Sequence, residues 1–430
     1  MFLQNSGIIN RVFLVGKGIQ VATHALKSIA DVPRPAPLGP LERHVFAEMS
    51  HAFAARLLVT CARIDLISAI NHARISALMN DAEPVGKRCC VIFHACKVTE
   101  KFVFAVDFAY ICKRNQRQPI IMRKVIGLGE TVLDIIFKGF KPVNALPGGS
   151  AFNAIISLGR SGIATTFIGE AGNDRIGNYV TDFLHDNGVA TDGINVFPDS
   201  KSPLSLAFLD ADNNADYLFY KDHPHDRLEF TYPEINRDDI VLFGSFFAVN
   251  PIIHAEVNEF LKLAHQKGAI LYYDVNFRPS HRHEVMKITP NFIDNLELST
   301  FVRGSHEDFE VLYKQTDAAK VYQNQVKFYC KNIIYTRGSK PVSVFATPQF
   351  QKDYDVPPLQ PVSTIGAGDN FNAGFIYGLL KEHITLQQIE EGLSAAQWDA
   401  LIGSAQAFSA ACCQDIYNYV SEAFGQKMSM

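Results

Sequence analysis

The sequence lacks the features that mark several common classes of protein. It contains no run of roughly 18 consecutive apolar residues, and this absence excludes a transmembrane helix. Its formal net charge is −4, whereas a protein that binds nucleic acid presents a basic surface to the phosphates. We therefore expect neither a membrane nor a nucleic acid among the partners of this protein.

The cysteines form no paired CxxC pattern of the kind that holds zinc. Adjacent residues such as Cys412 and Cys413 do not readily build a disulfide framework. The cysteine pattern is therefore typical of a reduced, intracellular protein, and we expect a cytoplasmic location. Cys412 and Cys413 themselves are expected to be small packing residues.

A dinucleotide-binding fingerprint is also missing. Gly127 and Gly129 are followed by Val132 at the position where GxGxxG has its third glycine. A nicotinamide or flavin cofactor is therefore not expected at this turn.

The first part of the chain differs from the rest. Residues 1–123 hold 16 Lys and Arg against 8 Asp and Glu. Residues 1–30 contain no acid, as in organelle-targeting segments, but they lack the apolar core of a secretory signal. We interpret residues 1–121 as an extension of unknown structure, either dispensable or the product of a mis-assigned upstream start. An accessory domain that binds a partner is the alternative.

From Lys124 onward, short apolar runs alternate with helical patterns. This alternation predicts an α/β domain with a doubly wound, mostly parallel sheet and helices on both faces. Ligands of such sheets bind at the carboxyl ends of the strands. The expected strands lie within 124–130, 165–170, 238–245, 268–275 and 331–338, and the expected helices within 150–159, 175–186, 254–265, 307–313 and 368–380.

One segment departs from this alternation. Ser202–Asp222 alternates apolar and polar residues on both sides of the turn formers at 212–214, a pattern that predicts a β-hairpin. Together with Thr131–Phe140 it is expected to form a small antiparallel sheet outside the main one. Such a sheet would be a lid, a dimer surface or both.

The stretch STIGAGDNF places Gly366 and Gly368 before an apolar helix, with Asp369 in its first turn. The free N–H groups and the dipole of a helix start attract an anion, and glycines let the anion approach. A carboxylate beside an anion site suits a base that takes a proton from a hydroxyl attacking a phosphoryl group. The alternative is that Asp369 merely caps the helix.

A second stretch, LPGGSAFNA, has a similar form. Gly148 and Gly149 precede a helical pattern, and Asn153 falls in its first turn. The side-chain amide offers both a donor and an acceptor, which suits recognition of hydroxyl groups. Asn153 would otherwise be an ordinary exposed helix residue.

These stretches, with GEAGNDRIG, DVNFRP and YTRGSK between them, occur in the order found in the ribokinase-like (PfkB) family of carbohydrate kinases. The resemblance covers roughly residues 124–420 and is strongest to fructokinases. It implies that Asp369 is the general base and that Gly366, Ala367 and Gly368 form the anion hole. It further implies that the sugar is held by Asp134, Gly148, Gly149, Asn153 and Arg278, and the nucleotide by Thr336 and Gly338.

The chain departs from the family pattern at two places. Ser363 stands where the family usually has an acid that helps to hold a monovalent cation, so the use of potassium stays open. The magnesium-linked N-x-x-E motif occurs only as SHED, Ser305–Asp308. The resemblance therefore places a metal at Glu307 or Asp308.

The resulting hypothesis is an enzyme that uses ATP and Mg²⁺ to phosphorylate a hydroxyl of a small sugar, with fructose as the first expectation. A nucleoside kinase or a 2-keto-3-deoxygluconate kinase on the same fold is an alternative, and Arg278 would favour an acidic substrate. A sugar-binding regulator without turnover is an alternative from another class. The expected partners are the sugar and ATP, with a homodimer as the default assembly.

Overall fold

The structure, a computed structural model, describes residues 123–209, 215–220, 228–347 and 350–429, and three short strands before them. The chain divides into two units, Met1–Ile121 and Met122–Met430. In the first unit, β1 (Val12–Phe13), β3 (Lys101–Val106) and β2 (Phe93–Val98) form an antiparallel sheet in that order. The interpretations of residues 1–30, and of most of 1–121, lie outside the described residues.

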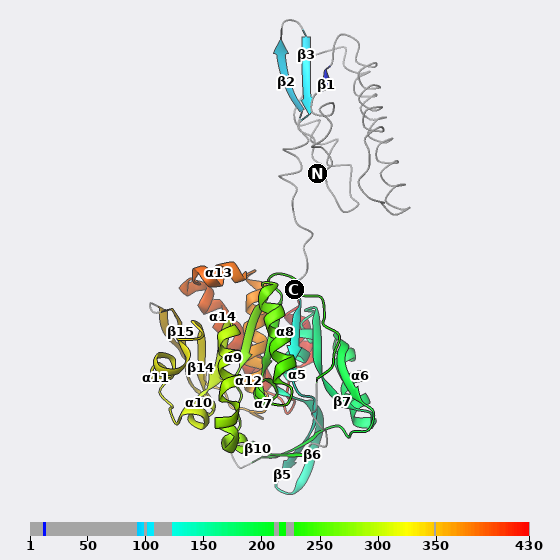
Figure 1. Cartoon of the computed structure of the whole chain (residues 1–430), viewed down its shortest axis with the longest axis vertical. Coiled ribbons are helices and arrows are strands. Elements are labelled where there is room, and N and C mark those ends of the chain that lie inside the picture. Colours follow the sequence, from blue (N-terminus) through cyan, green and yellow to red (C-terminus); the bar gives the residue numbers. More distant parts are fainter. Residues whose placement is uncertain are drawn as a thin grey trace. The chain divides into compact units, whose positions relative to one another are not determined.

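The second unit is built on a nine-stranded sheet, which confirms the predicted fold class (Figure 1). Every neighbouring pair from β8 to β14 is parallel, and the last two pairs, β14 with β15 and β15 with β16, are antiparallel. In order, the strands are β16 (Phe350–Tyr354), β15 (Lys340–Thr347), β14 (Ile333–Arg337), β13 (Phe301–Ser305), β12 (Ile270–Asp274), β11 (Ile240–Gly244), β4 (Val125–Leu128), β7 (Thr165–Gly172) and β8 (Val189–Phe197).

Helices cover both faces of this sheet, as the continuous apolar runs of its central strands require. In β12, Ile270 and Tyr272 point into one core and Leu271 and Tyr273 into the other. Burying each such side chain contributes about 1.5–3 kcal/mol. The first core includes α5 (Ser150–Arg160), α6 (Arg175–Asp186), α12 (Ala367–Lys381), α13 (Leu386–Glu391) and α14 (Ala395–Cys413).

The second core lies on the opposite face of the sheet. It includes α7 (Ser245–Val249), α8 (His254–Gln266), α9 (Val285–Leu298), α10 (His306–Tyr313), α11 (Ala318–Val321) and the π-helical turn Tyr322–Val326. A 3₁₀ helix, Pro279–Glu284, precedes α9, and α15 (Glu422–Lys427) lies near the C-terminus. Cys412 and Cys413 are buried, free thiols in α14, which agrees with their expected packing role.

A second, four-stranded sheet has the order β10 (Ala215–Tyr220), β9 (Leu204–Leu209), β5 (Val132–Lys138), β6 (Lys141–Gly148). Figure 1 shows β5, β6 and β10 at one end of the second unit and α13 at the other. The predicted hairpin is present as the antiparallel pair β9 and β10, although its turn residues lie outside the described ranges. The predicted small sheet is present, but it is mixed, because β9–β10 and β5–β6 pair antiparallel whereas β5 pairs with β9 in parallel.

Among the described residues, no helix has the length and apolar character needed to cross a membrane. Several elements of the second unit were not expected from the sequence. They include α9, which contains Pro290, and β13, which directly follows it and contributes to the site described below.

Candidate active site

The turn that opens α12 has the conformation of an anion site. Gly366, which precedes the helix, has a φ of +75°, a left-handed conformation that favours glycine. A Cβ at this position would also collide with the main-chain oxygen of Asn418. The N–H groups of Gly368 and Asp369 lie in the first turn and have no acceptor within the helix. With the positive end of the helix dipole, they suit a negatively charged group.

Asp369 joins this turn to the start of α5. Ser150 Oγ lies 2.9 Å from Asp369 Oδ1, and Asn153 Nδ2 donates to Asp369 Oδ2 over 2.8 Å. Both partners lie in the first turn of α5, directly after Gly148 and Gly149. The structure therefore brings the two glycine-rich stretches together through side chains, although they are far apart in the sequence.

The environment of Asp369 tunes its acidity. Burial raises the pKa of Asp369 to about 6, hydrogen bonds from Asn153 and Ser150 oppose this shift, and the negative charge of Asp274 adds to it. A carboxylate with this pKa is ionised at neutral pH and is a stronger base than an ordinary aspartate. These are the properties of a general base.

Ser150 connects Asp369 to a second carboxylate. Its Oγ also lies 3.1 Å from Oδ2 of Asp274, the last residue of β12. A serine hydroxyl has one proton to donate, so it can bond only one of the two carboxylates at a time. Both acids therefore depend on the same hydroxyl.

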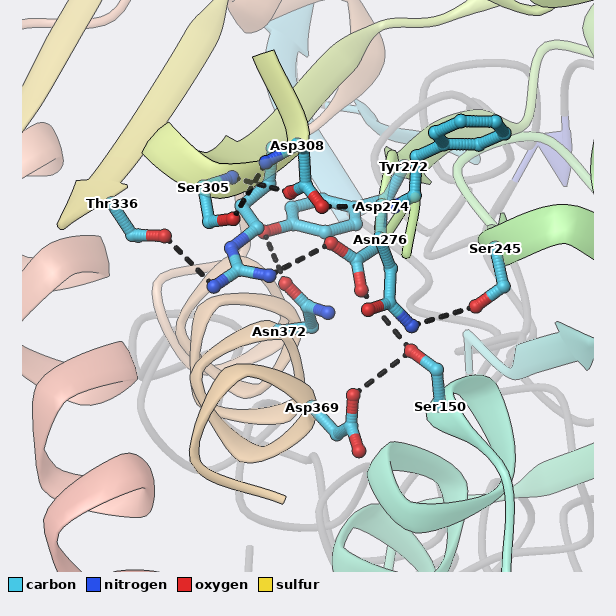
Figure 2. A network of polar contacts seen from close by, with 12 residues as sticks. Ser150, Ser245, Tyr272, Asp274, Asn276, Ser305, Asp308, Thr336, Asp369 and Asn372 are labelled. Atoms are coloured by element: carbon cyan, nitrogen blue, oxygen red, sulfur yellow. Dashed lines mark hydrogen bonds and ion pairs between the residues drawn. The ribbon is translucent and has the colours of Figure 1, made fainter. Parts of the chain in front are cut away.

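A buried arginine neutralises Asp274 and extends the network to the next strands. Arg303 Nη1 donates to Asp274 Oδ1 over 2.9 Å, and Arg303 Nη2 donates to Thr336 Oγ1 over 2.8 Å. A Cβ added at Gly368 would come within 3.0 Å of Arg303 Nη2, so this positive charge lies directly beside the α12 turn. Figure 2 shows the network from Thr336 on β14 to Ser150 and Asp369.

Two residues with unusual backbone conformations lie next to this network (Figure 2). Ser245 follows β11 with a φ of +55°, and Asn276 follows β12 with a φ of +35°. Asn276 Nδ2 donates to Ser245 Oγ over 2.7 Å. Positive φ values outside glycine cost free energy and occur often at functional sites. Here they shape the carboxyl ends of two adjacent parallel strands.

Asp134 lies in β5 of the small sheet and is buried. Asn418 Nδ2 donates to Asp134 Oδ2 over 2.7 Å. Burial raises the pKa of Asp134 to about 7, the charge of Asp369 adds to this shift, and the hydrogen bond from Asn418 opposes it. The electrostatic influence of Asp369 on Asp134 shows that both predicted site residues belong to one region.

Arg278, four residues after the end of β12, is exposed. Its guanidinium lies 5.3 Å from the centre of the Tyr217 ring. Because Tyr217 belongs to β10, this cation–π contact joins the main sheet region to the small sheet.

The two predicted nucleotide residues occupy different positions. Thr336 is buried near the end of β14 and takes part in the network through Arg303. Gly338 lies in the turn between β14 and β15 with a φ of +61°, outside the hydrogen-bonded network.

The two predicted metal ligands differ as well. The Asp308 carboxylate accepts from the main-chain N–H groups of Phe277 and Ser305, at 2.8 and 2.6 Å. It thereby closes the capping box of α10. Glu307 is exposed. Among the described residues, no group of three or more His, Cys, Asp or Glu side chains is placed to hold a metal ion.

Sequence reasoning missed three residues of this site: Ser150, Arg303 and Asn418. Ser150 stands inside the recognised GGSAFNA stretch but was given no role there. Arg303 interrupts the short apolar run of β13, a strand that the sequence did not lead us to expect, so its position offered no signal. Nothing in the local sequence distinguishes Asn418.

The second unit has counterparts among known proteins. Residues 123–417 match the model of the pfkB family of carbohydrate kinases. A 5-dehydro-2-deoxygluconokinase of Geobacillus thermodenitrificans is 27% identical over 261 residues, which span 58% of this chain and 77% of that protein. A probable chloroplastic fructokinase of Arabidopsis thaliana is 27% identical over 297 residues, spanning 63% of this chain and 74% of that protein.

Solved structures share the fold. The fructokinase of Vibrio cholerae O395, bound to fructose, ADP and calcium, aligns with a TM-score of 0.61 at 21% identity and covers 69% of this chain and 94% of its own. An aminoimidazole riboside kinase from Salmonella enterica, complexed with aminoimidazole riboside and an ATP analogue, gives 0.59 at 20% identity, with coverages of 71% and 98%.

Proposed function

The chain belongs to the pfkB family of carbohydrate kinases, and from this premise we propose that it transfers the terminal phosphoryl group of ATP to a hydroxyl of a small sugar, with Asp369 as the general base. The observation that carries the proposal is the position of Asp369. It is a carboxylate with a pKa of about 6 in the first turn of a glycine-led helix.

The proposed chemistry follows from this placement. Asp369 takes the proton of the attacking hydroxyl, while Ser150 and Asn153 hold its two oxygens in place. The Gly366–Gly368 turn offers N–H groups to the charge that develops on the transferred phosphoryl group. Arg303, beside Gly368, adds a fixed positive charge.

The sugar is proposed to lie between Asp369 and the small sheet. Asp134 accepts hydrogen bonds from its hydroxyls, Gly148 and Gly149 allow it to approach the backbone, and Asn153 and Arg278 contact it. The cation–π contact of Arg278 with Tyr217 of β10 supports the role of the small sheet, residues 131–140 and 202–222, as a lid. Closure of such a lid excludes water from the transfer. The same sheet is proposed as the surface of a homodimer.

ATP is proposed to bind across the α12 turn and the end of β14, with Thr336 and Gly338 on the nucleotide side. The described residues do not form a magnesium site by themselves. Mg²⁺ in kinases is held by one or two carboxylates and the phosphates of the substrate. Glu307 is exposed and free to serve as such a carboxylate, whereas the oxygens of Asp308 are occupied by N–H donors.

A sugar acid is the second candidate substrate. Arg278 places a positive charge near Asp134 and Asp369, and a neutral hexose needs no such charge. Among the relatives, one is named for 5-dehydro-2-deoxygluconate and another for fructose. Residues 122–430 are proposed to carry the whole activity, without the first unit.

The test is Asp369→Asn in the full chain, assayed by ADP release with MgATP. The acceptors are fructose, 5-dehydro-2-deoxygluconate, 2-keto-3-deoxygluconate, ribose, adenosine and fructose 6-phosphate. We expect the unchanged protein to phosphorylate one of the sugars, and the variant to lose about 10²–10⁴-fold in kcat, the contribution of a general base. Retained turnover would refute the role of Asp369. Binding without turnover in the unchanged protein would favour a regulator, and turnover of adenosine alone a nucleoside kinase.

A further inference from the structure

Asn418 is a fully buried side chain in the segment between α14 and α15. It lies one residue beyond the part of the chain that matches the carbohydrate kinase family, residues 123–417. The resemblance in the sequence assigns it no role. Its surroundings in the structure do.

The side chain of Asn418 contacts two residues on the proposed sugar side. Its Nδ2 donates to Asp134 Oδ2 over 2.7 Å. A Cβ added at Gly148 would collide with that same Oδ2 and would lie 3.1 Å from Asn418 Nδ2. Asp134, Gly148 and Asn418 are therefore packed against one another, and the buried amide of Asn418 supports the carboxylate.

The backbone of Asn418 contacts the proposed anion hole. Its carbonyl oxygen accepts from Asn370 Nδ2 over 2.9 Å, and this oxygen is the atom that excludes a side chain at Gly366. The same amide group of Asn370 also donates to Gly366 O over 2.8 Å. One residue thus spans the distance between the sugar side and the phosphoryl side of the site.

The amide of Asn418 is held in one orientation by charge. Asp134 in its ionised form can only accept hydrogen bonds, so Nδ2 must face it and Oδ1 must face away. Oδ1 is buried without a hydrogen-bond partner among the described residues. Leaving a buried acceptor unpaired costs free energy, and such groups persist where function requires the arrangement.

We propose that Asn418 is a positioning residue, which holds the Asp134 carboxylate ionised and oriented toward the sugar and ties it to the Gly366 turn. This inference rests on the proposed function, specifically on Asp134 as a sugar ligand. Loss of the amide removes a donor from a buried carboxylate, so Asp134 takes up a proton at higher pH and binds hydroxyls less well.

The experiment compares Asn418→Leu and Asn418→Asp in the full chain, with the acceptor that the protein phosphorylates. Leucine keeps the volume and removes the donor, and aspartate replaces the donor with a like charge. We expect Asn418→Leu to raise KM for the acceptor about 10- to 100-fold, the effect of one hydrogen bond to a charged group, with a smaller change in kcat and an unchanged KM for ATP. In Asn418→Asp the KM for the acceptor should increase further as pH rises, because the two adjacent carboxylates then both carry charge.

The matched control is Asn295→Leu, because Asn295 is also fully buried and donates from Nδ2 to a main-chain oxygen, Ala248 O, outside the network. A general loss of stability would affect this variant equally. The inference is overturned if Asn418→Leu keeps the acceptor KM of the unchanged protein, or if it changes both KM values and kcat in the manner of Asn295→Leu.

Asp134→Asn separates failure of the inference from failure of its premise. If Asp134→Asn raises the acceptor KM and Asn418→Leu does not, only the role of Asn418 fails. If Asp134→Asn leaves the acceptor KM unchanged, both roles fail. If no acceptor is phosphorylated, the proposed function fails.

A double-mutant cycle still tests the contact in that case. The free energy of unfolding in urea is measured for Asp134→Asn, Asn418→Leu and the double variant. Additive effects of the two substitutions would show that Asn418 does not hold Asp134 and would overturn the inference.

Discussion

Arg303 and Asp274 form a buried ion pair, with 2.9 Å between Nη1 and Oδ1 and side-chain exposures of 10% and 3%. The pair connects two adjacent parallel strands, β13 and β12, at their carboxyl ends. Arg303 Nη2 bonds Thr336 on the next strand. A single guanidinium therefore fixes three consecutive strands at the edge of the sheet where the site lies.

Arg303→Met should destabilise the protein strongly. Methionine retains much of the volume but leaves Asp274 buried without a counter-charge, and breaking a buried pair in this way costs about 3–5 kcal/mol. The free energy of unfolding in urea measures the loss. The double variant Arg303→Met with Asp274→Asn should recover much of it, and a double variant as unstable as the single one would contradict the ion pair as the cause.

The rate should depend on the ionisation of Asp369. The pKa of Asp369 is raised to about 6 and that of Asp134 to about 7. Since the base acts when deprotonated and the proposed sugar ligand accepts hydrogen bonds when ionised, kcat/KM should fall as pH decreases through the range from about 7 to about 6 and below. A rate profile between pH 4.5 and 8.5 tests this. A profile that stays flat down to pH 4.5 would exclude Asp369 as the titrating base.

Ser150→Ala should move the fall of kcat/KM to higher pH. The hydroxyl donates to Asp369 or Asp274, and its loss removes a hydrogen bond that lowers the pKa of Asp369. Ser161→Ala is the matched control, because Ser161 is a buried serine just after α5, and its Oγ donates to Ser157 O, away from both carboxylates. We expect kcat/KM to begin falling at higher pH in Ser150→Ala, and at the pH of the unchanged protein in Ser161→Ala. Equal profiles would show that Ser150 does not act on the base.

Residues 122–430 retain Arg123 and should be active without the first unit. Arg123 Nε donates to Asp238 O over 2.6 Å and Nη1 donates to Ile384 O over 2.8 Å, so it clamps the start of β4 to two distant loops. We expect chains 1–430 and 122–430 to have equal kcat/KM, and chain 125–430 to unfold at lower temperature. Loss of turnover in 122–430, with its stability retained, would show that the first unit takes part in catalysis.

The sequence predicts those parts of the fold whose signals are local. Apolar runs and glycine-led helix starts indicate α5 and α12, and their N-termini carry Asn153 and Asp369 as expected. The parallel pairing of β5 with β9 was not predictable in this way. A hairpin pairs residues that are close in sequence, whereas β5 and β9 meet only after the chain has formed β6, α5, β7, α6 and β8.

The parts of the site that escaped prediction depend on tertiary contacts. Arg303 reads as a solvent-facing residue in a short, interrupted run, and only the neighbouring strands supply Asp274 and Thr336. Asn418 follows a helix in a polar stretch, and its partner Asp134 lies 284 residues away. Spacing rules act over a few turns of a helix, so they cannot reveal such a pair.

The position of Asn418 has a consequence for the order in which the protein is made. The segment that carries it is anchored to α5 by Arg160, whose Nη1 donates to Val420 O over 2.7 Å. During synthesis the ribosome releases β5 and α5 long before this segment emerges. Asp134 and the Gly366 turn therefore lack their common neighbour until residue 418 has emerged, and a chain stopped short of residue 418 would leave the ribosome with an unfinished site.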